Sequence, residues 1–209
     1  MLLKLIVSIV LTIVALFVCK KTDTKISSPA NDNDGVIFIC LVPTVTYFVI
    51  SYGALDMTAP FGKTALLALE SICSAIWVQL LVVGKGVDYM RSGEDGKIAL
   101  MEFCPLITIF LMTDCLNGLG YNLLYTLGIA IMTIALYVRT NSLDLSISLH
   151  LIMNASRTFT DTFITAHTVD LSTYRILYIC NCAFAVIIGL WLLQGVYKST
   201  LSEEGKFNG

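Results

Sequence analysis

The chain has 209 residues, of which 56% are hydrophobic and only 13% are charged, and its mean hydropathy is +0.82. Soluble domains carry about 25% charged residues, so this composition excludes an ordinary soluble protein and indicates an integral membrane protein. The net charge of −2 and the lack of any basic stretch argue against a nucleic-acid partner.

Hydrophobic segments long enough to cross a bilayer follow one another along the chain, as a window of about 20 residues shows. They predict an all-α fold, a polytopic membrane helical bundle that forms one integral membrane domain over residues 1–209. Seven spans are predicted, over residues 2–19, 36–54, 64–84, 99–118, 121–138, 145–164 and 174–197.

The first predicted span has Lys4 near its start, followed by an apolar run, and this pattern resembles a secretory signal. The charge of the flanking loops decides whether the segment is retained or removed. With the N-terminus outside, nine Lys or Arg residues fall in the inner connections and three fall outside. Inner loops are enriched in Lys and Arg. We therefore expect the segment to be retained, with the N-terminus outside and the C-terminus in the cytoplasm, because its removal would place the two richest basic loops outside.

Acidic residues occur inside the third and fourth predicted spans. Glu70 lies near the start of the third span with Ser71 beside it, where a carboxyl group is either protonated and hydrogen-bonded or ionised beside a cation or a hydrated cleft. Both states make Glu70 a candidate for proton transfer. Asp114 lies near the end of the fourth span, and Glu102 lies near its start, where it can serve the helix N-terminus or interfacial water.

The sixth span carries four polar residues at steps of four, three and four: His150, Asn154, Arg157 and Asp161. This spacing puts their side chains on one helical face, which cannot face lipid because each ionisable group costs about 2.5–3.5 kcal/mol at membrane depth. The face must line a protein interior. The sequence leaves two interpretations open, a functional cavity and a structural polar seam that joins this helix to its neighbours.

Three of these residues together carry the groups that hydrolysis requires. The Glu70 carboxylate would take a proton from water, the His150 imidazole would relay or steady it, and the Asn154 amide would donate to a developing oxyanion. A zinc site needs more nitrogen ligands than the single histidine inside a predicted span provides. We therefore expect no bound metal and no cofactor.

The turn and helix around His150 resemble a known family. The run Thr140-Asn141-Ser142, followed by His150-Leu151-Ile152-Met153-Asn154, resembles the last motifs of the CAAX-protease and bacteriocin-processing family of intramembrane endopeptidases, in which a Thr-Gly-Ser-like turn precedes a helix with His-x-x-x-Asn. Upstream, that family has Glu-Glu-x-x-x-Arg and Phe-x-x-x-His on successive helices.

The two upstream motifs are degenerate in this chain. The segment from Glu70 to Ala75 falls where the first would lie and keeps only the leading glutamate. The segment from Phe110 to Asp114 falls where the second would lie, with aspartate in the place of the histidine. The resemblance covers about Lys63 to Arg157.

The resemblance implies a helical bundle that cleaves a membrane-anchored peptide or protein within the lipid bilayer. Glu70 would activate water, His150 would stabilise the tetrahedral intermediate and Asn154 would be an oxyanion donor, while Asp114 would place a second acid near Glu70. The missing arginine and second glutamate leave two alternatives open. One is a catalytically inactive member acting as an immunity or regulatory protein on a membrane partner, and the other is a small-solute transporter subunit that binds its ligand along the His150 face.

Overall fold

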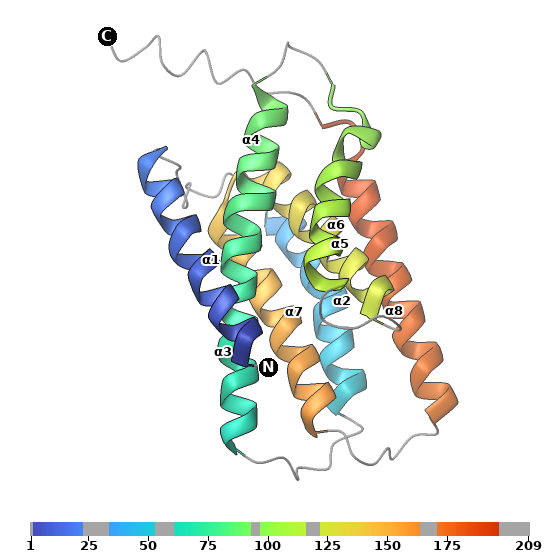
Figure 1. Ribbon diagram of the computed structural model, residues 1–209. Helices are drawn as coiled ribbons and strands as arrows, with labels where there is room; N and C mark the ends of the chain where they lie inside the picture. The colour runs from blue at the N-terminus through green and yellow to red at the C-terminus, as the bar shows by residue number, and fades with distance from the viewer. Residues whose placement is uncertain are drawn as a thin grey trace.

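The computed structural model describes residues 2–22, 34–52, 61–92, 97–115, 122–163 and 171–196. Within these ranges the chain is helical apart from short connections and a single bridge residue, Lys97. The helices are α1 (Leu2–Lys21), α2 (Asp34–Tyr52), α3 (Phe61–Trp77), the π-helix η1 (Val78–Gly84), α4 (Lys85–Arg91), the 3-10 helix η2 (Leu100–Phe103), α5 (Cys104–Cys115), α6 (Asn122–Thr140), α7 (Leu143–Phe163) and α8 (Leu171–Leu193). Figure 1 shows them running side by side as a bundle, which confirms the predicted fold class.

The third predicted span is longer in the structure than in the sequence analysis, because α3, η1 and α4 form one continuous rod from Phe61 to Arg91. The prediction ended at residue 84, where the hydrophobic run gives way to polar residues. A helix does not need to stop where it becomes amphipathic, and the last two turns continue with partly buried Lys85 and Asp88 and a buried Arg91.

In the part of the chain that the structure describes, four helical segments are long and apolar enough to cross a membrane, which supports the prediction of a membrane protein. They are Leu2–Lys21, Ala68–Arg91, Leu123–Thr140 and Arg175–Leu193. The apolar parts of the other three rods are shorter within the described residues, and they are Gly35–Thr46, Leu100–Thr113 and Leu143–Ala155.

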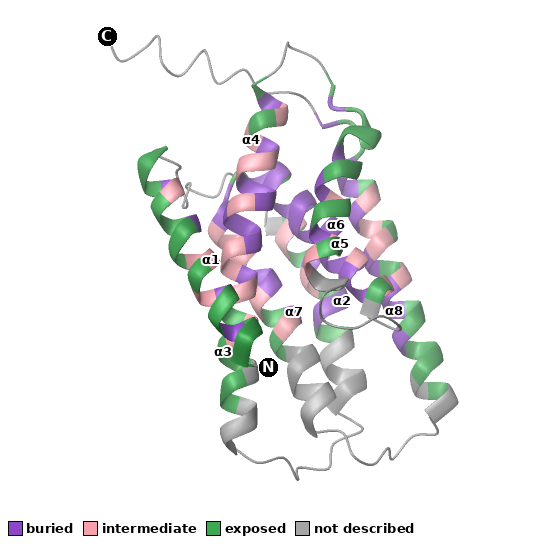
Figure 2. Cartoon of the chain, viewed as in Figure 1, coloured by how far each residue is buried: buried purple, intermediate pink, exposed green. Residues whose placement is uncertain are grey.

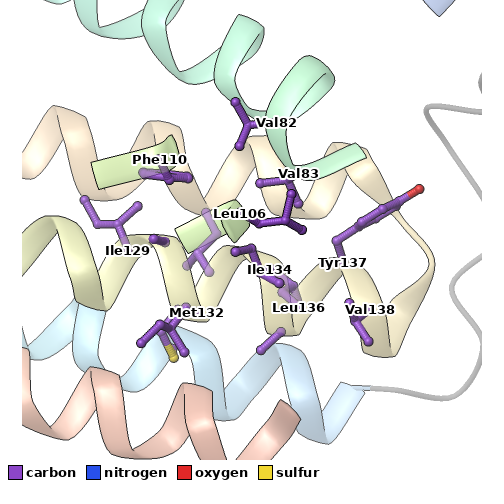
Figure 3. Packing of buried hydrophobic residues seen from close by; sticks show 14 of the residues in the cluster. Val82, Val83, Leu106, Phe110, Ile129, Met132, Ile134, Leu136, Tyr137 and Val138 are labelled. Atoms are coloured by element: carbon purple, nitrogen blue, oxygen red, sulfur yellow. The ribbon is translucent and has the colours of Figure 1, made fainter. Parts of the chain in front are cut away.

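Helix α6 lies at the centre of the bundle, with α2, α5, α7, α8 and η1 packed around it. Nearly every side chain from Tyr125 to Val138 is buried, and these residues form much of the purple core in Figure 2. Figure 3 shows side chains of α6 gathered with residues of η1 and α5, among them Val83, Leu106, Phe110, Ile129, Met132, Ile134 and Leu136. A helix that is apolar on every side, as α6 is, fits such a central position.

Helices α6 and α8 pack against each other along their length, with glycines at their contact. A Cβ atom at Gly189 of α8 would lie 2.5 Å from Ile131 Cγ2 and 3.2 Å from the Ile131 backbone carbonyl carbon. A Cβ atom at Gly128 of α6 would lie 3.3 Å from the Ala185 side chain of α8. Small residues let the two backbones come close, as they commonly do between membrane helices.

Helix α1 lies at the edge of the bundle and packs along α3 with one face only. The buried residues of that face are Leu5, Ser8, Ala15 and Cys19. The Thr12 hydroxyl lies 2.9 Å from the carbonyl oxygen of Cys73 in α3. Most other residues of α1 are exposed, and they include large aliphatic side chains such as Leu3 and Phe17, so this surface is suited to contact with lipid tails.

Hydrogen bonds tie the C-terminal ends of α6 and α8 together at one end of the bundle. The Arg139 guanidinium donates to the carbonyl oxygens of Leu192 at 2.6 Å and Gln194 at 2.8 Å. The backbone N–H of Ile98 donates to the carbonyl of Val196 at 2.9 Å. The bond to Leu192 satisfies a carbonyl that the end of α8 would otherwise leave without an intrahelical partner.

Candidate functional site

A buried polar cluster around His150 lies where α7, η1 and α6 meet. Gln79 Nε2 of η1 lies 3.0 Å from His150 Nδ1 of α7, and the Ser146 hydroxyl, one turn earlier on α7, lies 2.7 Å from Gln79 Oε1. The same hydroxyl lies 2.8 Å from the backbone carbonyl oxygen of Thr133 in α6. Gln79 and Ser146 are 0% exposed and His150 is 4% exposed, so the cluster is closed off from solvent.

Gln79 occupies the middle of the span Ala68–Arg91, at the start of the π-helical segment η1. A π-helix is rare and usually occurs as a short insertion in an α-helix, frequently at a functional site. Gly84 closes the segment, and a Cβ atom there would lie 3.1 Å from Leu143 Cδ2 of α7 and 3.3 Å from the Gln79 carbonyl oxygen. The glycine therefore allows η1 to lie against the start of α7, the helix that carries His150.

An aromatic ring covers the imidazole on another side. The rings of Phe110 in α5 and His150 have centroids 5.1 Å apart and are inclined by 30°. Phe110 is 2% exposed and belongs to the core shown in Figure 3. The described surroundings of the imidazole therefore combine a neutral amide and a phenyl ring.

In the structure, Glu70 lies at a different level of the bundle from Gln79 and His150. Glu70 lies nine residues before Gln79 on the same helical rod, which corresponds to about 13 Å along the axis at 1.5 Å per residue. It is half-buried near the beginning of the candidate span, between exposed Leu69 and Ile72, and Ser71 beside it is also half-buried. Since Gln79 is level with His150, Glu70 is about two and a half turns of helix away from that level.

The remaining predicted site residues lie on α7 and α5. Asn154 lies one turn after His150 on α7 and is half-buried. Asp114 lies in the last turn of α5, and Arg157 and Asp161 lie in the last turns of α7. The side chains of Asp114, Arg157 and Asp161 fall outside the described residues, so their predicted approach to Glu70 and His150 stays a prediction.

A second polar cluster fixes the turn between α6 and α7, from which the His150 helix starts. The Arg91 guanidinium at the end of α4 donates through Nη1 to Asn141 Oδ1 and through Nη2 to the Val138 carbonyl oxygen at 2.9 Å. It also lies over the Tyr137 ring, 5.6 Å from the centroid, and the Tyr137 hydroxyl donates to Asp88 Oδ1 at 3.0 Å. Arg91 therefore joins the rod that carries Gln79 to the turn that starts α7.

The turn itself is the predicted Thr140-Asn141-Ser142 segment. Asn141 has a φ of 57°, in the left-handed region that ends many helices and that asparagine tolerates better than most residues. Its N–H donates to the Tyr137 carbonyl oxygen at 2.8 Å, which completes the end of α6. At the start of α7, the Ser142 hydroxyl donates to Asp144 Oδ1, and the same oxygen accepts from the Leu145 N–H at 2.9 Å.

Among the residues that the structure describes, no group of three or more His, Cys, Asp or Glu side chains is placed to hold a metal ion. Glu102, the second acid of the fourth predicted span, is exposed and its Oε1 lies 3.4 Å from the Ala99 N–H at the start of η2. This contact agrees with the predicted alternative that Glu102 serves a helix N-terminus.

Sequence reasoning missed Gln79, Ser146 and Arg91. A neutral amide within the apolar run from Ile76 to Val83 was the available signal for Gln79, since a lone glutamine at membrane depth requires a partner. The π-helix has no comparable signal in the sequence. Ser146 lies one turn before His150, on the same face as the four polar residues already singled out, and it extends that face toward the start of α7.

Comparison of the chain with protein-family models, with curated proteins and with solved structures finds no match.

Proposed function

We propose that this protein is a non-hydrolytic membrane protein related in architecture to the CAAX-protease-like endopeptidases, and that it acts by binding a membrane-anchored peptide or protein. The observation that carries this proposal is the pairing of Gln79 with His150 at 3.0 Å. A carboxylate in that place would activate water as a general base, whereas a carboxamide has no basic lone pair for this purpose.

The position of Gln79 also gives a second way to compare the chain with the family pattern. When Glu-Glu-x-x-x-Arg is set on Val78-Gln79-Leu80-Leu81-Val82-Val83, Gln79 takes the place of the second glutamate, and valines take the places of the first glutamate and the arginine. Every charged position of that motif is then neutral. This alignment fits the contact with His150 better than the alignment on Glu70, which lies about 13 Å away along the helix axis.

Orientation in the membrane is part of the same proposal. Arg91, Lys97 and Arg139 lie at one end of the bundle, where the ends of α4, α6 and α8 are joined by hydrogen bonds. Lys4 and Arg175 lie near the opposite ends of α1 and α8. Because inner loops are enriched in Lys and Arg, the end with Arg91, Lys97 and Arg139 faces the cytoplasm and the N-terminus of α1 faces outward.

The functional proposal is tested by comparing protein termini in membranes of cells that produce the wild-type chain with those of cells that produce Glu70→Gln/His150→Ala. A non-hydrolytic protein leaves the two sets of termini the same. An active intramembrane peptidase produced in the same cells serves as the positive control. New termini that need the wild-type chain and are lost in Glu70→Gln would instead establish a peptidase with Glu70 as its base.

The orientation is tested by labelling single cysteines with a thiol reagent that does not cross membranes. In a background where all seven native cysteines are replaced by serine, Arg175→Cys is expected to react in intact cells and Lys97→Cys only after the membrane is opened. The reverse pattern would place the basic end outside and overturn the orientation.

A further inference from the structure

The rod formed by α3, η1 and α4 is fixed firmly in its inner half. A Cβ atom at Gly86 of α4 would overlap the Leu106 side chain of α5, so these two helices pack closely. The Arg91 guanidinium at the end of α4 donates to the Val138 carbonyl oxygen at 2.9 Å. Both contacts hold α4 in one position relative to the helices around it.

The outer half of the rod, helix α3, borders lipid and α1. The side chains of Leu69 and Ile72 are 43% and 45% exposed. Thr12 Oγ1 of α1 lies 2.9 Å from the Cys73 carbonyl oxygen, which is a backbone atom. A bond to a backbone carbonyl does not fix α3 in one register, because the next residue of a helix offers an equivalent acceptor about 1.5 Å further along the axis.

The π-helical segment η1 lies between these two halves. The Lys85 N–H donates to the Leu80 carbonyl oxygen, five residues back, whereas an α-helix uses the carbonyl four residues back. Such a segment places one extra residue in the rod. If η1 changed to α-helical bonding while α4 stayed in place, α3 would turn by about 100° and move by about 1.5 Å along its axis. Each residue of α3 would then take the place that its predecessor holds now.

The side chain of Gln79 holds η1 in its π-helical form. Gln79 is the one residue of Val78–Gly84 with a polar side chain. Its Nε2 lies 3.0 Å from His150 Nδ1, and its Oε1 accepts from the Ser146 hydroxyl at 2.7 Å. A turn of about 100° would carry Gln79 away from both groups. Since all three side chains are buried, the loss of these bonds would be costly.

The two ends of α3 place opposite demands on this form. After the turn, Glu70 would take the direction of Leu69, which is exposed to lipid, and an ionisable group there costs about 2.5–3.5 kcal/mol. Glu70 therefore also favours the π-helical form. In the part of the chain that the structure describes, the buried Trp77 indole N–H meets no acceptor, and a buried donor without a partner opposes the present form.

We propose that η1 is a switch between two registers of α3. In the π-helical register, Gln79 is paired with His150 and Glu70 is turned away from lipid. In the α-helical register, α3 is turned by about 100°, the Gln79 pair is open and Glu70 points toward lipid. A cationic or hydrogen-bond-donating group that pairs with Glu70 from the lipid side favours the second register, because it removes the cost of that position. This inference goes beyond the proposed function and does not rest on it.

The test measures which face of α3 meets lipid, in the full chain in lipid bilayers. A single nitroxide label is placed at residue 72 or 73 after all other native cysteines have been replaced by serine, and its accessibility to oxygen dissolved in the lipid is read by electron paramagnetic resonance. Without further changes, residue 72 is expected to be the more accessible, since Ile72 is 45% exposed and Cys73 is half-buried.

The double variant Glu70→Leu/Gln79→Leu removes both groups that favour the π-helical register. Residue 73 would then take the present place of residue 72, so the order of the two accessibilities is expected to reverse. A label at Tyr89, which is 82% exposed on α4, is expected to keep its accessibility because the inner half does not turn. An unchanged order at residues 72 and 73, with the Tyr89 label also unchanged, would show that η1 has one register and would overturn the inference.

Deletion of Leu81 is the matched control. It removes the extra residue, so η1 becomes α-helical while α3 and α4 keep their present faces. Residue 72 is expected to remain more accessible than residue 73, and a reversed order would contradict the assignment of one extra residue to η1.

The outcome is independent of the proposed function. The labels report the orientation of α3, whereas the function is tested by the termini of other membrane proteins. A fixed α3 with unchanged termini would reject only the switch, and a reversed order with new termini that need the wild-type chain would reject only the non-hydrolytic function.

Discussion

The variant Gly189→Val is expected to lower the free energy of unfolding by about 1–3 kcal/mol, the usual cost of forcing extra atoms into a packed core. The Cβ atom alone would lie 2.5 Å from Ile131 Cγ2 and 3.2 Å from the Ile131 backbone. A β-branched side chain and a helix backbone cannot move aside as the end of a flexible side chain can. Helices α6 and α8 would therefore have to separate along the centre of the bundle.

Thermal unfolding in mild detergent measures this effect in a background that keeps only the buried cysteines Cys19, Cys40 and Cys182, whose exposure a thiol-reactive fluorophore reports. The matched control is Gly35→Ala in the first turn of α2, where an added Cβ atom meets nothing within 4 Å. That change is expected to leave the midpoint unchanged or to raise it slightly, because alanine is the better helix former. Equal midpoints for wild type and Gly189→Val would show that α6 and α8 do not pack as closely as described.

Arg91→Ala is expected to destabilise the fold by about 2–3 kcal/mol, because hydrogen bonds made by a charged group are worth roughly 1.5–3 kcal/mol and the packing on Tyr137 is also lost. The guanidinium serves two acceptors on the α6–α7 turn, Asn141 Oδ1 and the Val138 carbonyl oxygen. Arg91→Lys is expected to recover only part of the loss, since an ammonium group lacks the planar fork that reaches both acceptors.

The same thiol assay measures the Arg91 series, with Lys97→Ala as the control for loss of one positive charge at this end of the bundle. Lys97 is exposed, and surface substitutions usually change stability by less than about 0.5 kcal/mol. A midpoint for Arg91→Ala equal to that of Lys97→Ala would mean that the buried guanidinium does not hold the turn.

The bundle could be predicted from the sequence, whereas the arrangement of its helices could not. Long apolar segments separated by polar connections define membrane helices through composition alone, and every predicted span overlaps a helix of the structure. Helix α1 and helix α6 are both strongly apolar, yet α1 lies at the edge and α6 at the centre. Lipid tails are as apolar as leucine, so hydrophobicity does not distinguish a surface that faces lipid from one that faces protein.

Part of the candidate site could be predicted from the sequence, and the rest depends on how the helices are arranged. The spacing of His150 and Asn154 predicted a polar face on one helix, and the structure buries His150 in a polar cluster. The partner from the third span could not be found in the same way, because spacing along one helix says nothing about the level at which another helix meets it. Glu70 was predicted as the partner of His150 because it is charged. In the structure, uncharged Gln79 of the π-helix η1 contacts His150.

The central position of α6 has a consequence for the order of assembly. During synthesis α6 enters the membrane before α7 and α8, the two helices that supply much of its covering. Contact between its aliphatic side chains and lipid tails costs little free energy. The backbone near Gly128, however, gains its close neighbours only when α8 packs against it. The centre of the bundle is thus completed only once α8 has been inserted beside α6.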